Sequence, residues 1–250
     1  MIDLKNISLS LNGRLILKNV SLHIQENTTS VILGSSGAGK STILKAILGL
    51  IRAQSGEVIV DGENITSRPE SEILEVRRKM AMVFQGNALF DSLTVEENTG
   101  FFLKEKNKSI TPAQVKAKVD EVLSFVNLTG NEDLYPDELS GGMKKRLAIA
   151  RALALDPKII LFDEPTTGLD PINSKAVLSL IEKLKERGTT SVIVTHILND
   201  AITIGDVLTI INEGRVVESG SVKKILNTKN EFVKEFFYEI YQDNSFIINN

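Results

Sequence analysis

The sequence predicts an α/β protein with a helix-covered parallel β-sheet, an antiparallel β-layer and an inserted helical segment. In the second half, short apolar runs alternate with helical patterns, which is typical of parallel strands joined by helices. These runs and helical patterns are 159–162, 173–187, 191–194, 199–205 and 207–211. In the first half, the β-branched run Ser30-Val31-Ile32-Leu33 leads through a glycine-rich segment into a helical pattern. A strand, a loop and a helix should therefore meet at one point.

The chain begins with a segment of alternating apolar and polar residues. Residues 2–32 follow this alternation, which Asn12-Gly13 interrupts with a typical hairpin turn. This segment predicts the antiparallel β-layer. Two more strands are expected, one over 55–62 with an Asp-Gly turn and one within 77–85.

Residues 34–42 follow the pattern GxxxxGK[ST]. Glycines allow successive backbone N–H groups to turn toward phosphate oxygens, and the following helix presents its positive end to the same anion. Lys40 can reach the β- and γ-phosphates, and the Ser41 hydroxyl can bind Mg²⁺. The alternative is a glycine-rich turn before an ordinary helix. The predicted nucleoside triphosphate site consists of Gly34, Ser35, Ser36, Gly37, Ala38, Gly39, Lys40, Ser41 and Thr42.

Residues 91–150 have helical patterns. Thr94 begins a capping box, and Thr111 precedes a proline at a first helical position. One apolar helical face carries Val115, Val119, Val122, Leu123 and Val126. We therefore expect residues 1–90 and 151–218 to form a core, 91–150 to form an inserted helical subdomain, and 219–250 to form a C-terminal tail.

Two carboxylates, Asp163 and Glu164, follow the apolar strand 159–162. Ligands of open α/β sheets bind at the carboxyl ends of strands. Asp163 is suited to hold Mg²⁺ through water, and Glu164 to orient an attacking water or accept its proton. An ordinary turn at Asp-Glu-Pro is the alternative.

A second anion site is expected at residues 139–143, where Leu-Ser-Gly-Gly-Met precedes a long helix predicted over 144–155. Ser140 is a good helix cap, and the two glycines leave the backbone bare. One chain cannot easily use both anion sites on a single triphosphate.

The LSGG motif, the phosphate loop, the strand ending in Asp-Glu and the later Thr195-His196 together resemble the ATP-binding cassette (ABC) ATPases. The resemblance covers residues 1–220. It implies a P-loop NTPase (RecA-like) core, with ATP and Mg²⁺ bound. It also implies a head-to-tail homodimer, in which each phosphate loop faces the partner's signature motif.

The resemblance also implies roles for single residues. Ser140, Gly141 and Gly142 would touch the γ-phosphate bound by the other subunit, and residues 168–170 would cross the dimer interface. Catalysis would use Glu164 as the base, with His196, Gln85 and Lys40. Mg²⁺ would be held by Ser41, Gln85 and Asp163. Leu11 stands where the family often has an aromatic residue that stacks on adenine.

A narrower resemblance rests on Met143 of LSGGM, on residues 84–95 and on residues 166–172, which look like the phospholipid-trafficking (Mla or MCE-associated) ATPases. It implies phospholipid cargo, an integral membrane permease, an MCE-type lipid-binding protein and an accessory subunit. The chain would be peripheral at the cytoplasmic face of the inner membrane. Another cargo (amino acid, metal ion or lipoprotein) and a non-transport ABC ATPase are the alternatives.

Composition excludes several classes of function. The net charge of −3 offers no electrostatic footprint for nucleic acid. The absence of cysteine excludes disulfides and thiolate metal sites. No apolar stretch approaches the length of a membrane span, so another chain would have to cross the bilayer.

Three surface features are expected. Ala88-Leu89-Phe90 and Leu93 form an apolar patch that either contacts a permease or anchors its own loop. The basic segments 104–108 and 144–146 are expected to be solvated. The tail is expected to pack on a neighbouring subunit through Phe232, Phe236, Phe237, Tyr238, Tyr241 and Phe246.

Overall fold

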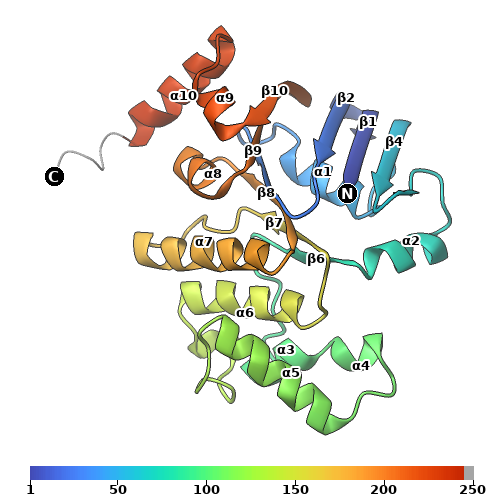
Figure 1. Ribbon diagram of the computed structural model, residues 1–250, viewed down its shortest axis with the longest axis vertical. Coiled ribbons are helices and arrows are strands. Elements are labelled where there is room, and N and C mark those ends of the chain that lie inside the picture. Colours follow the sequence, from blue (N-terminus) through green and yellow to red (C-terminus); the bar gives the residue numbers. More distant parts are fainter. Residues whose placement is uncertain (245–250) are drawn as a thin grey trace. The chain divides into compact units, whose positions relative to one another are not determined.

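The computed structural model describes residues 1–244, and side chains up to residue 239 (Figure 1). The chain divides into two compact units. One consists of Met1–Arg77 and the segment from Thr190 onward, and the other of Arg78–Thr189. The predicted division into core, helical subdomain and tail has different boundaries and stays a prediction.

The first unit contains the antiparallel sheet, whose strand order is β2-β1-β4-β5. The strands are β1 (Ile2–Leu11), β2 (Arg14–Ile24), β4 (Ser55–Val60) and β5 (Glu63–Asn64). Strand β1 pairs with β2 from Ile2 opposite Ile24 to Leu11 opposite Arg14. The turn is made by Asn12 and Gly13, with φ values of 50° and 77°. The predicted β-layer and its hairpin turn are thereby confirmed.

The first unit also contains parallel β-strands. Strand β3 (Thr29–Leu33) is fully buried and pairs in parallel with β8 (Thr190–Thr195) and with β9 (Val207–Asn212). Strand β10 (Arg215–Ser221) pairs antiparallel to β9 and was not predicted from the sequence. Its side chains are only partly buried, so it lacks the apolar run by which the other strands were found.

The helices of the first unit are α1 (Lys40–Ile47), α2 (Glu70–Arg77), α8 (Leu198–Ile204), α9 (Val222–Leu226) and α10 (Glu231–Asn244). The predicted helical tail begins later than expected, because β10 continues to Ser221. Helix α10 buries Val233 and Phe237 within this chain, whereas Tyr238 is 65% exposed. Phe246 and the side chain of Tyr241 lie outside the described residues, so the predicted packing of the tail on a neighbour stays a prediction.

The second unit pairs strand β6 (Met80–Val83) in parallel with β7 (Ile159–Asp163). Its helices are α3 (Val95–Gly100), α4 (Leu103–Lys106), α5 (Pro112–Phe125), η1 (Pro136–Glu138), α6 (Gly141–Leu153) and α7 (Pro171–Glu186). Helix α6 contacts β6, α3, α5 and α7, and so forms the centre of this unit (Figure 1). Together, the parallel and antiparallel strands and their helices confirm the predicted α/β class.

Local sequence signals account for the helix starts of the second unit. Thr94 and Thr111 each accept a hydrogen bond from the backbone N–H three residues later, and each capping box is complete. Val119, Val122 and Leu123 are buried on one face of α5, as their spacing predicts. Among the helices of residues 1–244, none combines the length and the apolar character needed to cross a bilayer.

Candidate functional site

The phosphate loop of the first unit connects β3 to α1, and its shape requires glycine. Gly37 and Gly39 have φ values of 78° and 102°, which side chains with a Cβ rarely adopt. A Cβ at Gly34 would lie 2.4 Å from the carbonyl oxygen of Ile211 on β9. The glycines thus allow both the backbone turn and its close approach to the neighbouring strand.

Lys40 begins helix α1 and is only 7% exposed. Its Nζ donates hydrogen bonds to the carbonyl oxygens of Gly34 at 2.8 Å and Ser35 at 3.0 Å. The positive charge therefore lies directly at the loop backbone. Phosphate oxygens would meet a buried cation and a helix N-terminus at this point.

A residue outside the motif supports the loop from the β9–β10 turn. The N–H of Gly214 donates to the carbonyl oxygen of Ala38 at 3.1 Å. Gly214 has a φ of 77°, and a Cβ there would lie 1.9 Å from the carbonyl oxygen of Ile16. Gly214 was not predicted as part of the site, although Glu213-Gly214 is a turn signal after a predicted strand.

His196 follows strand β8 at the same edge of the sheet as the loop. Thr195 pairs with Leu33, and its carbonyl oxygen accepts a hydrogen bond from the N–H of Gly34 at 3.4 Å. The His196 side chain is exposed. Within the first unit, the fold thus brings His196 close in register to the start of the phosphate loop.

Gln85 and Asp163 lie at the carboxyl ends of the two parallel strands of the second unit. Val83 of β6 pairs with Phe162 of β7, so Gln85 follows β6 by two residues and Asp163 ends β7. Gln85 is exposed and Asp163 half-buried. These two predicted Mg²⁺ residues therefore lie at the same edge of the second unit.

Glu164 is held in an unusual conformation. It is 7% exposed and has a φ of 49°, in the left-handed region that residues other than glycine rarely adopt. Thr167 Oγ1 donates a hydrogen bond to Glu164 Oε2 at 3.0 Å. Strained backbone persists where surrounding contacts determine it, and it is common at active sites. Thr167, which orients this carboxylate, lies within residues 166–172 but was not predicted as a site residue.

The LSGG motif forms the start of helix α6. Ser140 is the N-cap and accepts a hydrogen bond from the N–H of Met143 at 3.3 Å. The helix spans Gly141–Leu153, so the expected range of 144–155 was wrong at both ends. Gly141 and Gly142 form part of the first turn of the helix, which the Ser140 side chain stabilises as its N-cap.

Asn173 connects the LSGG motif to the loop at residues 168–170. A Cβ at Gly142 would lie 2.0 Å from Asn173 Oδ1. Asn173 Nδ2 donates to Asp170 Oδ2 at 2.6 Å, and Arg146 Nη1 donates to Asn173 Oδ1 at 3.4 Å. Asp170 also caps helix α7, and hydrogen bonds from the backbone and side chain of Asn173 lower the pKa of its carboxyl group. The two predicted interface motifs are thus in contact through one amide.

Lys145 departs from the expectation that residues 144–146 form a solvated face. Its side chain is 2% exposed, and its Nζ donates to the carbonyl oxygens of Phe84 at 3.1 Å and Gln85 at 2.9 Å. Burial lowers the pKa of Lys145 to about 8. The prediction was wrong for this residue because position 145 shares a helix face with the buried Ala148 and Ile149.

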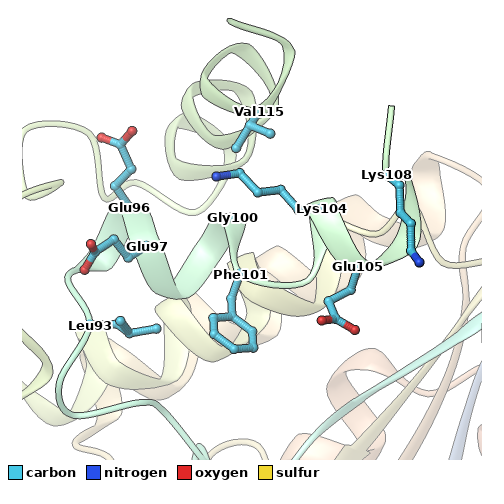
Figure 2. Close-up of a pocket in the computed structure, with 9 residues that line it drawn as sticks. All are labelled: Leu93, Glu96, Glu97, Gly100, Phe101, Lys104, Glu105, Lys108 and Val115. Atoms are coloured by element: carbon cyan, nitrogen blue, oxygen red, sulfur yellow. The ribbon is translucent and has the colours of Figure 1, made fainter. Parts of the chain in front are cut away.

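The apolar patch after Gln85 has two parts. Phe90 anchors its own loop, because its ring lies 4.4 Å from that of Phe101 and both its backbone groups bind the buried Asn98 side chain. Leu93 and Phe101, by contrast, line an open groove of about 710 Å³ (Figure 2). Anchoring of the loop is thus confirmed for Phe90, whereas a contact of Leu93 with a permease stays a prediction.

The predicted metal residues suit Mg²⁺ only together with a nucleotide. Among the side chains that the structure describes, residues 1–239, no group of three or more His, Cys, Asp or Glu could hold a metal ion. Ser41, Gln85 and Asp163 offer a hydroxyl, an amide and one carboxylate. Mg²⁺ is commonly bound by one or two carboxylates together with substrate phosphates. The donor set therefore fits a phosphate-bound ion rather than a permanent metal centre.

Comparison with known proteins supports one family. The model of the ABC transporter family matches residues 17–167. The methionine import ATP-binding protein MetN of Haemophilus ducreyi is 40% identical over 248 residues, covering 96% of this chain and 71% of that protein. The intermembrane phospholipid transport system ATP-binding protein MlaF of Haemophilus influenzae is 37% identical over 237 residues, covering 94% and 89%.

Solved structures agree with this result. The dimeric ATP-binding cassette MJ0796, in a post-hydrolysis state with ADP and Pi, has a TM-score of 0.81 at 35% identity and covers 90% of this chain and 100% of its own. The protein cbiO1 of Clostridium perfringens, part of the ABC transporter complex cbiONQ, has a TM-score of 0.83 at 27% identity, covering 98% of both chains. The predicted P-loop NTPase fold is thus confirmed, and the chain belongs to the ATP-binding subunits of ABC transporters.

Proposed function

We propose that this chain hydrolyses ATP as the dimeric motor subunit of a membrane transporter. The observation that carries the proposal is the glycine loop at 34–42 with the buried Lys40 ammonium group at its backbone. A buried cation beside bare N–H groups and a helix N-terminus suits the phosphates of a nucleotide.

In this proposal, each predicted site residue has one role in the reaction. The loop and Lys40 hold the phosphates, and Glu164 accepts the proton of the attacking water. Gln85 orients that water, and His196 contacts the γ-phosphate. Ser41, Gln85 and Asp163 would hold Mg²⁺, which would supply positive charge to the phosphates. Catalysis by positioning and electrostatic stabilisation is typical of phosphoryl transfer.

A second copy of the chain completes each site. Ser140, Gly141 and Gly142 would bind the γ-phosphate held by the partner, since the start of α6 carries N–H groups and the positive end of a helix. The related cassette MJ0796 was solved as a dimer with ADP and Pi, which supports this assembly.

The groove in Figure 2 is the proposed docking surface for a membrane permease. Leu93, Phe101 and Val115 supply apolar surface, and Phe101 is 43% exposed. Glu96 and Glu97 lie at one end of the groove, and Lys104 and Lys108 lie toward the other. The partner would therefore be an amphipathic helix that carries basic residues at one end and acidic residues at the other. Docking on a permease would make the chain peripheral at the cytoplasmic face of the membrane.

Phospholipid is the proposed cargo, delivered with an MCE-type lipid-binding protein. The LSGGM motif and the similarity to MlaF of Haemophilus influenzae support it. Methionine or another amino acid is the second candidate, because MetN proteins of several bacteria are 38–43% identical to this chain, with 43% for that of Carboxydothermus hydrogenoformans. Affinity purification of the full chain from its own membranes, followed by lipid and protein mass spectrometry, distinguishes the two. A permease with an MCE protein and phospholipid supports the first, whereas methionine uptake lost on deletion supports the second.

The ATPase assignment is tested with Glu164→Gln. We expect turnover to fall at least about 100-fold while ATP binding is retained and an ATP-bound dimer accumulates. Glu182→Gln, an exposed change on helix α7, is the matched control and should hydrolyse ATP like the unchanged chain. Normal hydrolysis by Glu164→Gln would contradict the proposed base.

A further inference from the structure

The segment after strand β6 is fastened to helix α6 by a buried ammonium group. Lys145 Nζ donates hydrogen bonds to the carbonyl oxygens of both Phe84 and Gln85, at 3.1 Å and 2.9 Å. Two consecutive carbonyl groups on one cation leave the intervening peptide little freedom to turn. The backbone of Gln85 is therefore held by the helix that begins with the LSGG motif.

The same helix holds this segment at a second point. Arg151 Nη2 donates to the carbonyl oxygen of Asn87 at 3.1 Å, and its guanidinium carbon lies 5.3 Å from the centre of the Phe90 ring. Asn87 and Ala88 have φ values of 62° and 51°, in the left-handed region. Such a backbone persists only where its surroundings determine it. The position of this segment thus depends on its bonds to helix α6.

The Lys145 side chain is only 2% exposed. A charged group removed from water is unfavourable unless hydrogen bonds compensate it, so burial favours the two bonds to Phe84 and Gln85. Breaking them would leave the ammonium group buried without these acceptors.

We propose that Lys145 is a positioning residue for ATP hydrolysis, which ties Gln85 to the helix that carries the signature residues. The inference rests on the proposed function, in which Gln85 serves Mg²⁺ and the attacking water. Ser140 and Lys145 are five residues apart on one helix, about 7.5 Å along its axis. Movement of the signature end against a partner's nucleotide is therefore transmitted to Gln85, which serves the chain's own nucleotide. The two ATP sites of a dimer are coupled through this helix.

The test measures ATP hydrolysis by the full chain in four lysine variants and in Gln85→Ala. Lys145→Met keeps length and volume but removes the donors, and we expect kcat to fall about 10-fold or more, because misplacing a positioned group is costly. The KM for ATP should stay within about threefold, since Lys145 touches no phosphate-loop residue in the bonds described above. Lys145→Arg should restore most of kcat, and Lys145→Gln, which keeps one donor group, should lie between. Lys144→Met, the same change one residue earlier, is the control and should match the unchanged chain.

The outcomes separate this inference from the proposed function. The dependence of rate on ATP concentration should become less cooperative in Lys145→Met, and urea denaturation confirms that each variant is folded. If Gln85→Ala lowers kcat but Lys145→Met and Lys145→Gln do not, the positioning role is overturned while the proposed function stands. Loss of kcat without rescue by arginine, accompanied by an equal loss of stability, also overturns it. If Gln85→Ala itself leaves kcat unchanged, the proposed role of Gln85 fails.

Discussion

A methyl group at Gly142 has no room in the folded second unit. A Cβ there would lie 2.0 Å from Oδ1, 2.2 Å from Cγ and 2.8 Å from Cβ of Asn173, whereas non-bonded carbon atoms normally pack about 3.5–4.0 Å apart. Turning the amide alone would not relieve the contact with the Asn173 Cβ. Gly142→Ala must therefore separate helices α6 and α7 or move Asn173 away from Asp170 and Arg146.

Overpacking of this kind costs about 1–3 kcal/mol, so we expect Gly142→Ala to lower the free energy of unfolding by that amount. Asn173→Ala alone should cost about 1 kcal/mol, because its hydrogen bonds are partly exposed. In the double variant only the 2.8 Å contact with the Cβ of residue 173 remains, because alanine lacks the amide group. The two effects should therefore not add but differ from their sum by about 1–2 kcal/mol.

The assay is urea denaturation of the full chain, followed by far-ultraviolet circular dichroism because the chain contains no tryptophan. The slope m is fitted for each variant, so that a change in the unfolding transition is detected. ATP hydrolysis of the double variant adds a second readout. If stability returns but turnover does not, Gly142 is also needed where the backbone meets phosphate. Equal destabilisation by Gly142→Ala with and without Asn173 would refute the reasoning.

Three further predictions concern residues that the fold places around the motifs. Asn98→Ala should lower the free energy of unfolding by about 2–4 kcal/mol in urea denaturation, because the fully buried amide bonds both backbone groups of Phe90 and two further carbonyls; a change within 0.5 kcal/mol would contradict this. Gly214→Ala should weaken ATP binding at least about 10-fold in a titration. Its Cβ would lie 1.9 Å from the Ile16 carbonyl oxygen, so the N–H that binds the Ala38 carbonyl oxygen of the phosphate loop would be displaced. Gly62→Ala, at another left-handed turn position with open space, is the control. The folded-state pKa of Asp170 lies below its ordinary value of 3.8, so the charged carboxylate stabilises the fold above that pH and loses this effect as the pH falls through the folded-state pKa. The difference in unfolding free energy between the unchanged chain and Asp170→Asn should be constant above about pH 5 and shrink below about pH 4. A difference that stays constant down to about pH 3 would contradict this prediction.

The sequence by itself determined the elements whose signals are local. The glycines of residues 34–39, the capping boxes at Thr94 and Thr111, and the hairpin turn at Asn12-Gly13 each specify their own backbone through dihedral preferences and neighbouring hydrogen bonds. Parallel strands were likewise found from their apolar runs. The order of the motifs was sufficient to identify the family. The motif loops lie at the ends of strands and helices that the apolar patterns of the sequence also predict.

Only the tertiary structure decided which polar side chains are buried and what they hold. Lys145 and Gln85 are 60 residues apart, and Lys40 lies beside carbonyl oxygens of its own loop. The motif predicts that Lys40 meets phosphate, but no local pattern specifies the carbonyl oxygens to which either lysine donates. Burial depends on packing between distant segments, and desolvation then gives a buried charge its hydrogen-bond partners and its shifted pKa. The chemistry of the motifs could therefore be predicted from the sequence. The bond from the Lys145 ammonium group to the Gln85 carbonyl oxygen could be found only from the tertiary structure.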